Sequence, residues 1–377
     1  MERADLAGWL RLALTPGIGS TSGRKLLAAF GLPPQIFAQS RHALLQVVSD
    51  AQAHALQAPP RDFEEQLRRT ADWLQGTEAD GTPRRIVTLG DAGYPASLLE
   101  TADPPLMLYL LGAAAFDLTQ LERSIGMVGS RNPTAQGEQT ARAFARAFGE
   151  ADIAVVSGLA LGIDGAAHSG ALEAVGDSGR LATVAVVGTG LDRVYPARHR
   201  DLAHRIAAHG LIVSEYPLGT PPLNQNFPKR NRIIAGLTRG TLVVEAALGS
   251  GSLITARLAA EEGREVFAIP GSIHAPQSRG CHALIRQGAK LVESVGDVLE
   301  ELRFDAPVAA AHAAQSEPAA AESGLLADLG FDPVSLDALC ARTGYGAAQL
   351  QARLLELELE GHVARLPGGL FQRVARG

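Results

Sequence analysis

Cysteine is scarce in this sequence of 377 residues, and no apolar run reaches the roughly 18 residues that a membrane span requires. The two cysteines, Cys281 and Cys340, lie far apart and lack CxxC spacing, which argues against a disulfide framework and a zinc site. Both are expected to be reduced structural thiols. The first residues mix acids with bases and lack a small-residue cleavage site, so we expect no signal peptide. These absences predict a cytoplasmic protein without a bound metal.

The sequence also lacks an excess of positive charge. Its formal net charge of −6 argues against a protein that coats nucleic acid over its whole surface. One stretch departs from this average. Between residues 198 and 239 there are two acids, Asp201 and Glu215, and seven basic residues: Arg198, Arg200, Arg205, Lys229, Arg230, Arg232 and Arg239. That stretch is the candidate anion-binding surface.

The ends of the chain differ in pattern from its centre. Residues 1–80 have apolar residues at helical spacing around the glycine-containing stretch 15–20, which predicts a helical SAM-like (helix-hairpin-helix-like) domain. That hairpin either presents backbone N–H groups to a phosphate or is a plain turn that needs glycine, and the sequence leaves both open. Residues 304–323 are rich in Ala, Pro and Ser and predict a flexible linker. Residues 324–377 combine helix, turn, helix and a Gly-Gly hairpin, which is typical of a winged helix.

Residues 84–303 alternate short apolar runs with helical segments. Such runs are typical of strands buried on both faces, and the intervening helices predict an α/β fold with an extended Rossmann-like, doubly wound, mostly parallel sheet. In such sheets ligands bind at the carboxyl ends of the strands. The runs are IGMVGSR, IAVVSG, ATVAVVGTG, LIVSEY, TLVVEA, EVFAIPG and AKLVESV.

Two of these runs end in small or polar residues that suit an anion. Gly129 and Ser130 allow close backbone approach, and Arg131 offers a forked donor to phosphate, although a surface arginine that caps a loop has the same pattern. The second run ends in a loop with Ser157, Gly158 and Gly162, whose N–H groups would form an anion cradle. Its glycine spacing is not GxGxxG, so a nicotinamide cofactor is not expected.

Asp164 and His168 follow this loop on one face of the next helix. They are either an acid–base pair or the partners of an internal hydrogen bond that orders the loop, and Asp164 is also a candidate helix cap. We expect the internal hydrogen bond, because neither a nucleophile nor a cluster of metal ligands accompanies the pair.

The stretch 226–237 is the most informative. Its cations and amides at a Pro-containing helix start suit phosphate, and its aromatic ring suits base stacking, as single-stranded nucleic acid requires. The alternative is a solvated cationic turn with the ring in the core. The candidate residues are Phe227, Lys229, Arg230, Asn231 and Arg232.

A further turn before a helix contains Gly249, Ser250, Gly251 and Ser252. Its hydroxyl and N–H groups suit a phosphate, or the loop only turns tightly, and the sequence does not decide between the two. Together the loops would outline an extended track along one edge of the sheet.

Taken in order, these blocks resemble the successive signature blocks of the DNA processing protein A (DprA/Smf) family. They are GSR, SGLALGIDGAAH, GTGLDRVYPARH, SEYPLGTPP, FPKRNRIIAGL, VVEAALGSGSLITARLAAEEGREVFAIPG and GCHALIRQGA. The resemblance extends from about residue 125 to 290, includes the adjoining YPASLLETADPPLMLYLLG, and reaches both ends of the chain more loosely. One departure is His282, where the family commonly has Asn.

The resemblance implies a homodimer that binds single-stranded DNA without base specificity, protects incoming strands and loads the RecA recombinase during natural transformation. It implies neither catalysis nor a cofactor. Single-strand contacts would fall on Arg131 and on Phe227, Lys229, Arg230, Asn231 and Arg232, with backbone contacts from the loops at 158–162 and 249–252. Leu284, Ile285 and Leu291, beside an open sheet edge, are the expected dimer interface, although they would also serve to pack the final helix.

Two other functions compete with this one. A Rossmann-like sheet with glycine loops also resembles nucleotide-cleaving phosphoribohydrolases, but those enzymes carry a PGGxGT-type loop, whereas this chain has LGSGSLIT and PGSIH. A regulator that reads duplex DNA through the winged helix is the second. Its recognition helix, AAQLQARLLELELEG, has one Arg and three Glu, which is the wrong charge for a DNA groove.

Overall fold

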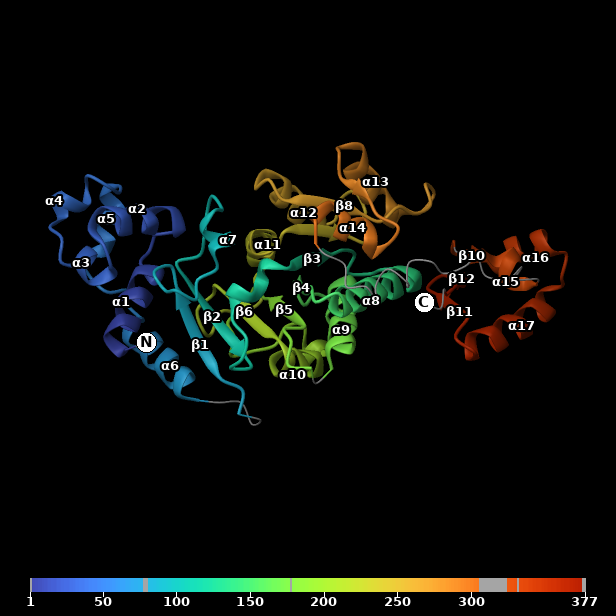
Figure 1. The fold of residues 1–377 in the computed structure, drawn as a ribbon, viewed down its shortest axis with the longest axis horizontal. Coiled ribbons are helices and arrows are strands. Elements are labelled where there is room, and N and C mark those ends of the chain that lie inside the picture. Colours follow the sequence, from blue (N-terminus) through green and yellow to red (C-terminus); the bar gives the residue numbers. More distant parts are fainter. Residues whose placement is uncertain (1, 77–80, 177, 305–323, 331, 375–377) are drawn as a thin grey trace.

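The computed structural model describes residues 2–76, 81–176, 178–304, 324–330 and 332–374. A helical N-terminal part, a large central sheet with helices on both faces, and a small C-terminal part follow one another along the chain (Figure 1). Apart from Phe304, the predicted linker 304–323 lies outside the described residues.

The N-terminal part consists of helices around an apolar core that includes Trp9, Leu10 and Leu26. The expected helix, glycine hairpin and helix are present, and Gly17 in the hairpin has a φ of 79°. The last helix contacts the first strand, and the ring of Trp73 meets Tyr109 edge to face, which joins this part to the sheet. The helices are α1 (Arg3–Leu14), α2 (Ser20–Phe30), α3 (Pro33–Phe37), α4 (Arg41–Leu44), α5 (Asp50–Leu56) and α6 (Phe63–Gln75).

The central sheet has nine strands in the order β1-β2-β6-β5-β4-β3-β7-β8-β9, and the predicted doubly wound, mostly parallel arrangement is confirmed. All seven predicted runs form strands. Two antiparallel strands, β1 and β2, were not predicted and extend the sheet beyond β6. The strands are β1 (Arg84–Thr88), β2 (Met107–Gly112), β3 (Ser124–Val128), β4 (Ala154–Ser157), β5 (Thr183–Val186), β6 (Leu211–Ser214), β7 (Gly240–Val243), β8 (Glu265–Ala268) and β9 (Lys290–Leu291).

Helices cover both faces of the sheet, which is why strands β2 to β7 are buried at every position (Figure 1). Successive residues alternate between the faces: Val155 packs toward α8 and α9, and Val156 packs toward α11. The helices are α7 (Ala96–Leu99), α8 (Ala135–Glu150), α9 (Ile163–Val175), α10 (Arg200–His209), α11 (Asn226–Leu237), α12 (Ser252–Glu261), α13 (Arg279–Arg286) and α14 (Val295–Leu302). Three short 3-10 turns are η1 (Leu118–Glu122), η2 (Ala197–His199) and η3 (Pro276–Ser278).

The direction of winding reverses at β3. From β3 the chain adds β4, β5 and β6 on one side, and then returns to place β7, β8 and β9 on the other. Because β3 pairs in parallel with both β4 and β7, the loops that leave β3 and β7 diverge to opposite faces. A crevice opens between such loops, and this switch point is where open α/β sheets bind ligands.

The C-terminal part has the helices and the two-stranded tip expected of a winged helix. Ser335 caps α16, accepting a hydrogen bond from the N–H of Ala338 at 3.2 Å, and Gly368 and Gly369 form the hairpin. An unpredicted short strand, β10, pairs with β12. The elements are α15 (Leu325–Leu329), β10 (Val334–Ser335), α16 (Leu336–Thr343), α17 (Ala347–Leu359), β11 (Val363–Leu366) and β12 (Leu370–Arg373). None of the helices in the described part of the chain is both long and apolar enough to cross a bilayer.

Candidate functional site

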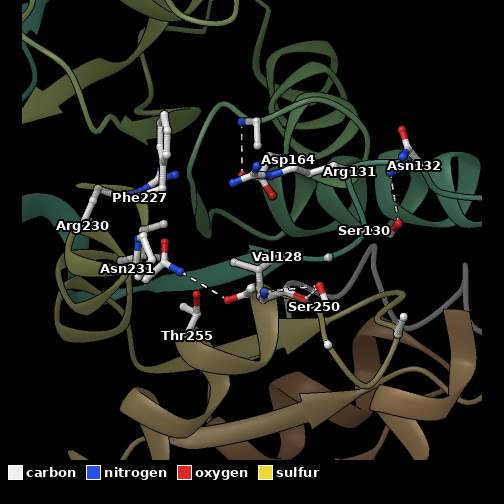
Figure 2. Close-up of a pocket in the computed structure, with 18 residues that line it drawn as sticks. Val128, Ser130, Arg131, Asn132, Asp164, Phe227, Arg230, Asn231, Ser250 and Thr255 are labelled. Atoms are coloured by element: carbon white, nitrogen blue, oxygen red, sulfur yellow. Dashed lines mark hydrogen bonds between the residues drawn. The ribbon is translucent and has the colours of Figure 1, made fainter. Parts of the chain in front are cut away.

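A pocket of about 450 Å³ lies at the switch point, between the loops that follow β3 and β7 (Figure 2). Its walls come from the loop after β3, the start of α9, the first turns of α11, and the loop between β7 and α12. Most of the predicted site residues meet here. The lining residues are Val128, Gly129, Ser130, Arg131, Asn132, Ala160, Asp164, Phe227, Pro228, Arg230, Asn231, Ile234, Ala247, Gly249, Ser250, Gly251, Ser252 and Thr255.

The loop after β3 supplies the exposed cation of the pocket. Gly129 is required for packing, because a Cβ there would lie 2.6 Å from Cγ1 of Ile163. Ser130 Oγ accepts a hydrogen bond from the N–H of Asn132 at 3.1 Å and turns the chain. The Arg131 side chain is exposed and makes no ion pair with any described residue. Its guanidinium is therefore available to an anion.

Phe227 is half-buried at the mouth of the pocket, so that it is neither a core residue nor a fully exposed one. Its ring stacks on Tyr195 with a centroid separation of 5.7 Å and an interplanar angle of 29°. The Arg131 guanidinium carbon lies 5.6 Å from the Phe227 centroid. Tyr195 was not among the predicted site residues.

Arg230 differs from the expectation of a surface cation. Only 3% of it is exposed, and its guanidinium donates to the carbonyl of Val186 beneath Gly158. Burial lowers the pKa of Arg230 to about 10, and the nearby Asp164 carboxylate acts in the opposite direction. The helical period explains the position, because Arg230 shares the inner face of α11 with Ile233 and Ile234.

The other two cations of this helix lie outside the pocket. Arg232 is bound by an ion pair to Glu215 and donates to the carbonyl of Asp103 at 2.7 Å, so its charge is already compensated. Lys229 is exposed and has no ion-pair partner among the described residues, but it does not line the pocket. The structure thus separates the predicted cluster into one buried, one paired and one free cation.

The loop after β4 is closed rather than open to a ligand. Ser157 is fully buried and its Oγ donates to the carbonyl of Met127 at 2.6 Å. A side chain at Gly158 would collide with the Arg230 guanidinium, and one at Gly162, where φ is 79°, would collide with the carbonyl of Ser130. These glycines are explained by packing against the neighbouring loop and helix.

Asp164 orders this loop, although not through His168. Its Oδ2 accepts hydrogen bonds from the N–H groups of Gly158 at 3.1 Å and Ala160 at 3.2 Å. The predicted pairing with His168 was wrong, because His168 Nδ1 lies 2.7 Å from Thr183 Oγ1 instead. Burial raises the pKa of the Asp164 carboxyl, and the positive charge of Arg230 and the two N–H donors offset part of that effect.

The loop between β7 and α12 is the most open wall. No atom would obstruct a Cβ at Gly249 or Gly251, so their backbone faces free space. Ser250 Oγ and Ser252 Oγ are 2.7 Å apart, and the Asn231 side chain donates to the carbonyl of Gly251 at 3.4 Å. This second contact fastens α11 to the loop.

Glu245, a residue that the prediction missed, fills the start of α8. Its two carboxylate oxygens accept hydrogen bonds from the N–H of Thr134 at 2.9 Å and from its hydroxyl at 2.6 Å. Asp164 lies in the first turn of α9 but accepts its hydrogen bonds from the loop that precedes the helix. Because helix N-termini attract anions, a carboxylate charge at each of these two helix starts disfavours a phosphate there. The start of α12 carries no carboxylate in its first turn.

The described residues contain no group of three or more His, Cys, Asp or Glu side chains that could hold a metal ion. Fold and pocket together define a Rossmann-like α/β protein whose candidate site is a pocket at the switch point, with one exposed arginine beside an aromatic pair.

Comparison with known proteins assigns the family. The family description "DNA recombination-mediator protein A" matches residues 85–303, and "DprA winged helix domain" matches residues 309–369. Protein Smf of Escherichia coli is 44% identical over 285 residues, which cover 73% of this chain and 74% of that protein. The DNA processing protein DprA of Streptococcus pneumoniae is 48% identical over 214 residues, covering 57% and 73%.

Two solved structures of this family superpose on the chain. DNA processing protein A from Streptococcus pneumoniae gives a TM-score of 0.65 at 35% identity, covering 81% of this chain and 99% of that one. The protein from Helicobacter pylori, whose structure is described in terms of its single-stranded DNA binding mode, gives 0.52 at 28% identity and covers 59% and 98%. The chain belongs to the DNA recombination-mediator protein A family.

Proposed function

We propose that this chain binds single-stranded DNA in the switch-point pocket without reading its sequence. It protects the bound strand and passes it to the RecA recombinase during natural transformation. The observation that carries the proposal is the pairing of Arg131, which is exposed and makes no ion pair with a described residue, with the half-buried ring of Phe227 at the mouth of the pocket. A phosphate and a base are the two groups that such a pair contacts together.

The start of α12 is the proposed phosphate position. Carboxylates lie at the starts of α8 and α9, whereas the loop at 249–252 leads into α12 with its glycine backbone unobstructed. A phosphate at α12 would face Arg131 across the pocket. The single-stranded DNA named for the Helicobacter pylori relative is consistent with this assignment.

Substitution of Arg131 tests the proposal. Arg131→Ala is expected to weaken binding of oligo-dT about tenfold and to lower the slope of log affinity against log salt by about 0.7, since one phosphate contact is lost. Fluorescence anisotropy over a series of salt concentrations measures both. Arg205→Ala is the matched control, because Arg205 is also an exposed arginine without an ion-pair partner among the described residues but lies outside the pocket.

The same titration separates the competing functions. Wild-type protein should bind oligo-dT more tightly than a duplex of equal length, and it should leave nucleoside monophosphates intact. Equal affinity of the wild type and a folded Arg131→Ala variant would remove the pocket from the binding site. Release of a base or phosphate from mononucleotides would replace the proposal with an enzymatic one.

The hand-over step is proposed to require a homodimer formed through the β9 edge. β9 is the last strand of the sheet, and Leu291 on it is 43% exposed. Leu284 and Ile285 on α13 are only partly buried, and they pack against the apolar core on the face of the sheet that α11 and α12 cover. His282 contacts the carbonyl of Gly271 at 3.0 Å, and Cys281 beside it is fully buried with its pKa raised to about 12 by burial.

Leu291→Asp is therefore expected to give a folded monomer that binds short oligo-dT normally and fails to promote RecA filament formation. Sedimentation at micromolar concentration measures the oligomeric state. Leu359→Asp, at the more exposed leucine of α17, should remain a dimer. A wild-type monomer would refute the dimer, and a dimeric Leu291→Asp variant would place the interface elsewhere.

A further inference from the structure

A second, larger groove of about 1130 Å³ begins where the switch-point pocket ends. Arg131 and Asn132 line both. The floor of the groove is the start of α9, with Gly162, Gly165 and Ala166, and the His199 ring packs over Gly165. The wall beyond is the segment that connects β5 to α10, and it contributes Arg198 and His199.

An aromatic stack lies beside the junction of the two cavities. Phe227 borders the pocket, and Tyr195 stacks on it from the segment that also carries Arg198. One side of the Tyr195 ring is covered by Phe227, yet 47% of the residue is exposed. The exposed side of the ring is a flat aromatic surface, and a nucleobase is a planar group that extends such a stack.

The charges in the groove are unbalanced in favour of an anion. Arg142 is bound by an ion pair to Glu173, so it is already compensated. Arg198 is exposed and has no carboxylate within ion-pairing distance among the described residues. Glu138 is the groove's acidic side chain, on α8. The winged-helix residues that line the opposite wall, such as Val363 and Pro367, carry no charge.

We propose that Tyr195 and Arg198 form an exit subsite for the single strand, in which a base that has left the pocket stacks on the exposed side of Tyr195 and a following phosphate contacts Arg198. The subsite rests on the proposed function and extends it beyond the pocket. It serves the part of the strand that the pocket itself cannot hold. Its contribution therefore depends on the length of the strand.

The experiment compares two oligo-dT lengths, a short one that only fills the pocket and a longer one that continues past it. For the wild type, the longer strand should bind more tightly. Tyr195→Ala and Arg198→Ala should each lose about tenfold of affinity for the longer strand, the order expected for one stacked base or one phosphate. Both should keep wild-type affinity for the short strand.

Matched variants separate stacking and charge from structural damage. Tyr195→Phe should bind both lengths as the wild type does, because it keeps the ring, and Arg198→Lys should recover most of the loss. Arg205→Ala, on α10 outside the groove, should change neither length. In a longer strand with a single abasic position scanned along it, one position should weaken the wild type but not Tyr195→Ala.

Three results have distinct meanings. Wild-type length dependence in both Tyr195→Ala and Arg198→Ala would overturn the exit subsite while leaving the pocket intact. An equal loss for short and long strands in Tyr195→Ala would also overturn it, because Tyr195 would then only support Phe227. Failure of the wild type to bind either length would refute the proposed function itself.

Discussion

Arg230→Met is expected to lower the free energy of unfolding by about 3 kcal/mol, the order seen when one partner of a buried charge pair is removed. Methionine preserves most of the apolar stem but leaves the buried Asp164 without the guanidinium that offsets its burial. The carbonyl of Val186 also loses its donor. Urea unfolding at neutral pH, followed by circular dichroism, measures the change.

The pH dependence of this loss identifies its cause. If Asp164 is the uncompensated charge, the difference between Arg230→Met and the wild type should shrink as the pH falls, because a neutral carboxyl no longer needs the guanidinium. The double variant Asp164→Asn/Arg230→Met should recover much of the stability. Arg205→Met, at an exposed site, should be neutral. A loss below about 1 kcal/mol in Arg230→Met would show that the buried guanidinium contributes little to the stability of the folded state.

His168→Asn is expected to weaken the acid sensitivity of the protein. Thr183 Oγ1 donates to the carbonyl of Val155 at 2.5 Å, so it accepts from His168 Nδ1, which leaves Nε2 buried and without a hydrogen-bond partner. A proton on Nε2 would therefore be buried without an acceptor. Burial accordingly lowers the pKa of His168 from 6.5 to about 3.

The sign of the effect follows from that shift. Between pH 6.5 and about 3 the unfolded chain binds a proton on this histidine and the folded chain does not, so His168 costs stability as the pH falls. The cost is about 1.4 kcal/mol for each pH unit in this window. Asparagine keeps the donor to Thr183 and does not titrate.

Urea midpoints of the wild type and His168→Asn should therefore converge as the pH falls from 7 toward 4, even though the variant starts less stable because of the smaller side chain. Parallel curves would mean that His168 is protonated in the folded protein as easily as in the unfolded one. The comparison cancels the contribution of acids such as Asp164, whose raised pKa acts in the opposite direction.

Much of the central fold could be predicted because its signal is local. Strands covered on both faces must be continuous apolar runs, and each of the seven predicted runs became one. β1 was missed because it is an edge strand with a partly polar sequence, RRIVT, in which only Ile86 and Thr88 are buried. The fully buried β2, MLYLLG, carried the same apolar signal as the others and was overlooked.

The site was predictable only in part, for a related reason. The loops could be recognised because small residues follow the strands. Whether each cation is buried, ion-paired or exposed depends on residues that are distant in the sequence. Arg232 is compensated by Glu215 and by Asp103, which no local pattern indicates. Arg230 could have been placed correctly, because it lies three and four residues before Ile233 and Ile234 on the inner face of a helix.

The carboxylates of Glu245 and Asp164 at the starts of α8 and α9 have a consequence for selectivity. These carboxylates are tethered to the protein, so that a free nucleotide in solution meets a negative charge at the start of both α8 and α9. A single phosphate then gains little from the pocket. A single strand compensates for this weak binding through many contacts, because each bound nucleotide raises the effective concentration of the next one at the protein surface. Under the proposed function, these two acids make the binding affinity depend on the length of the strand rather than on a single phosphate group.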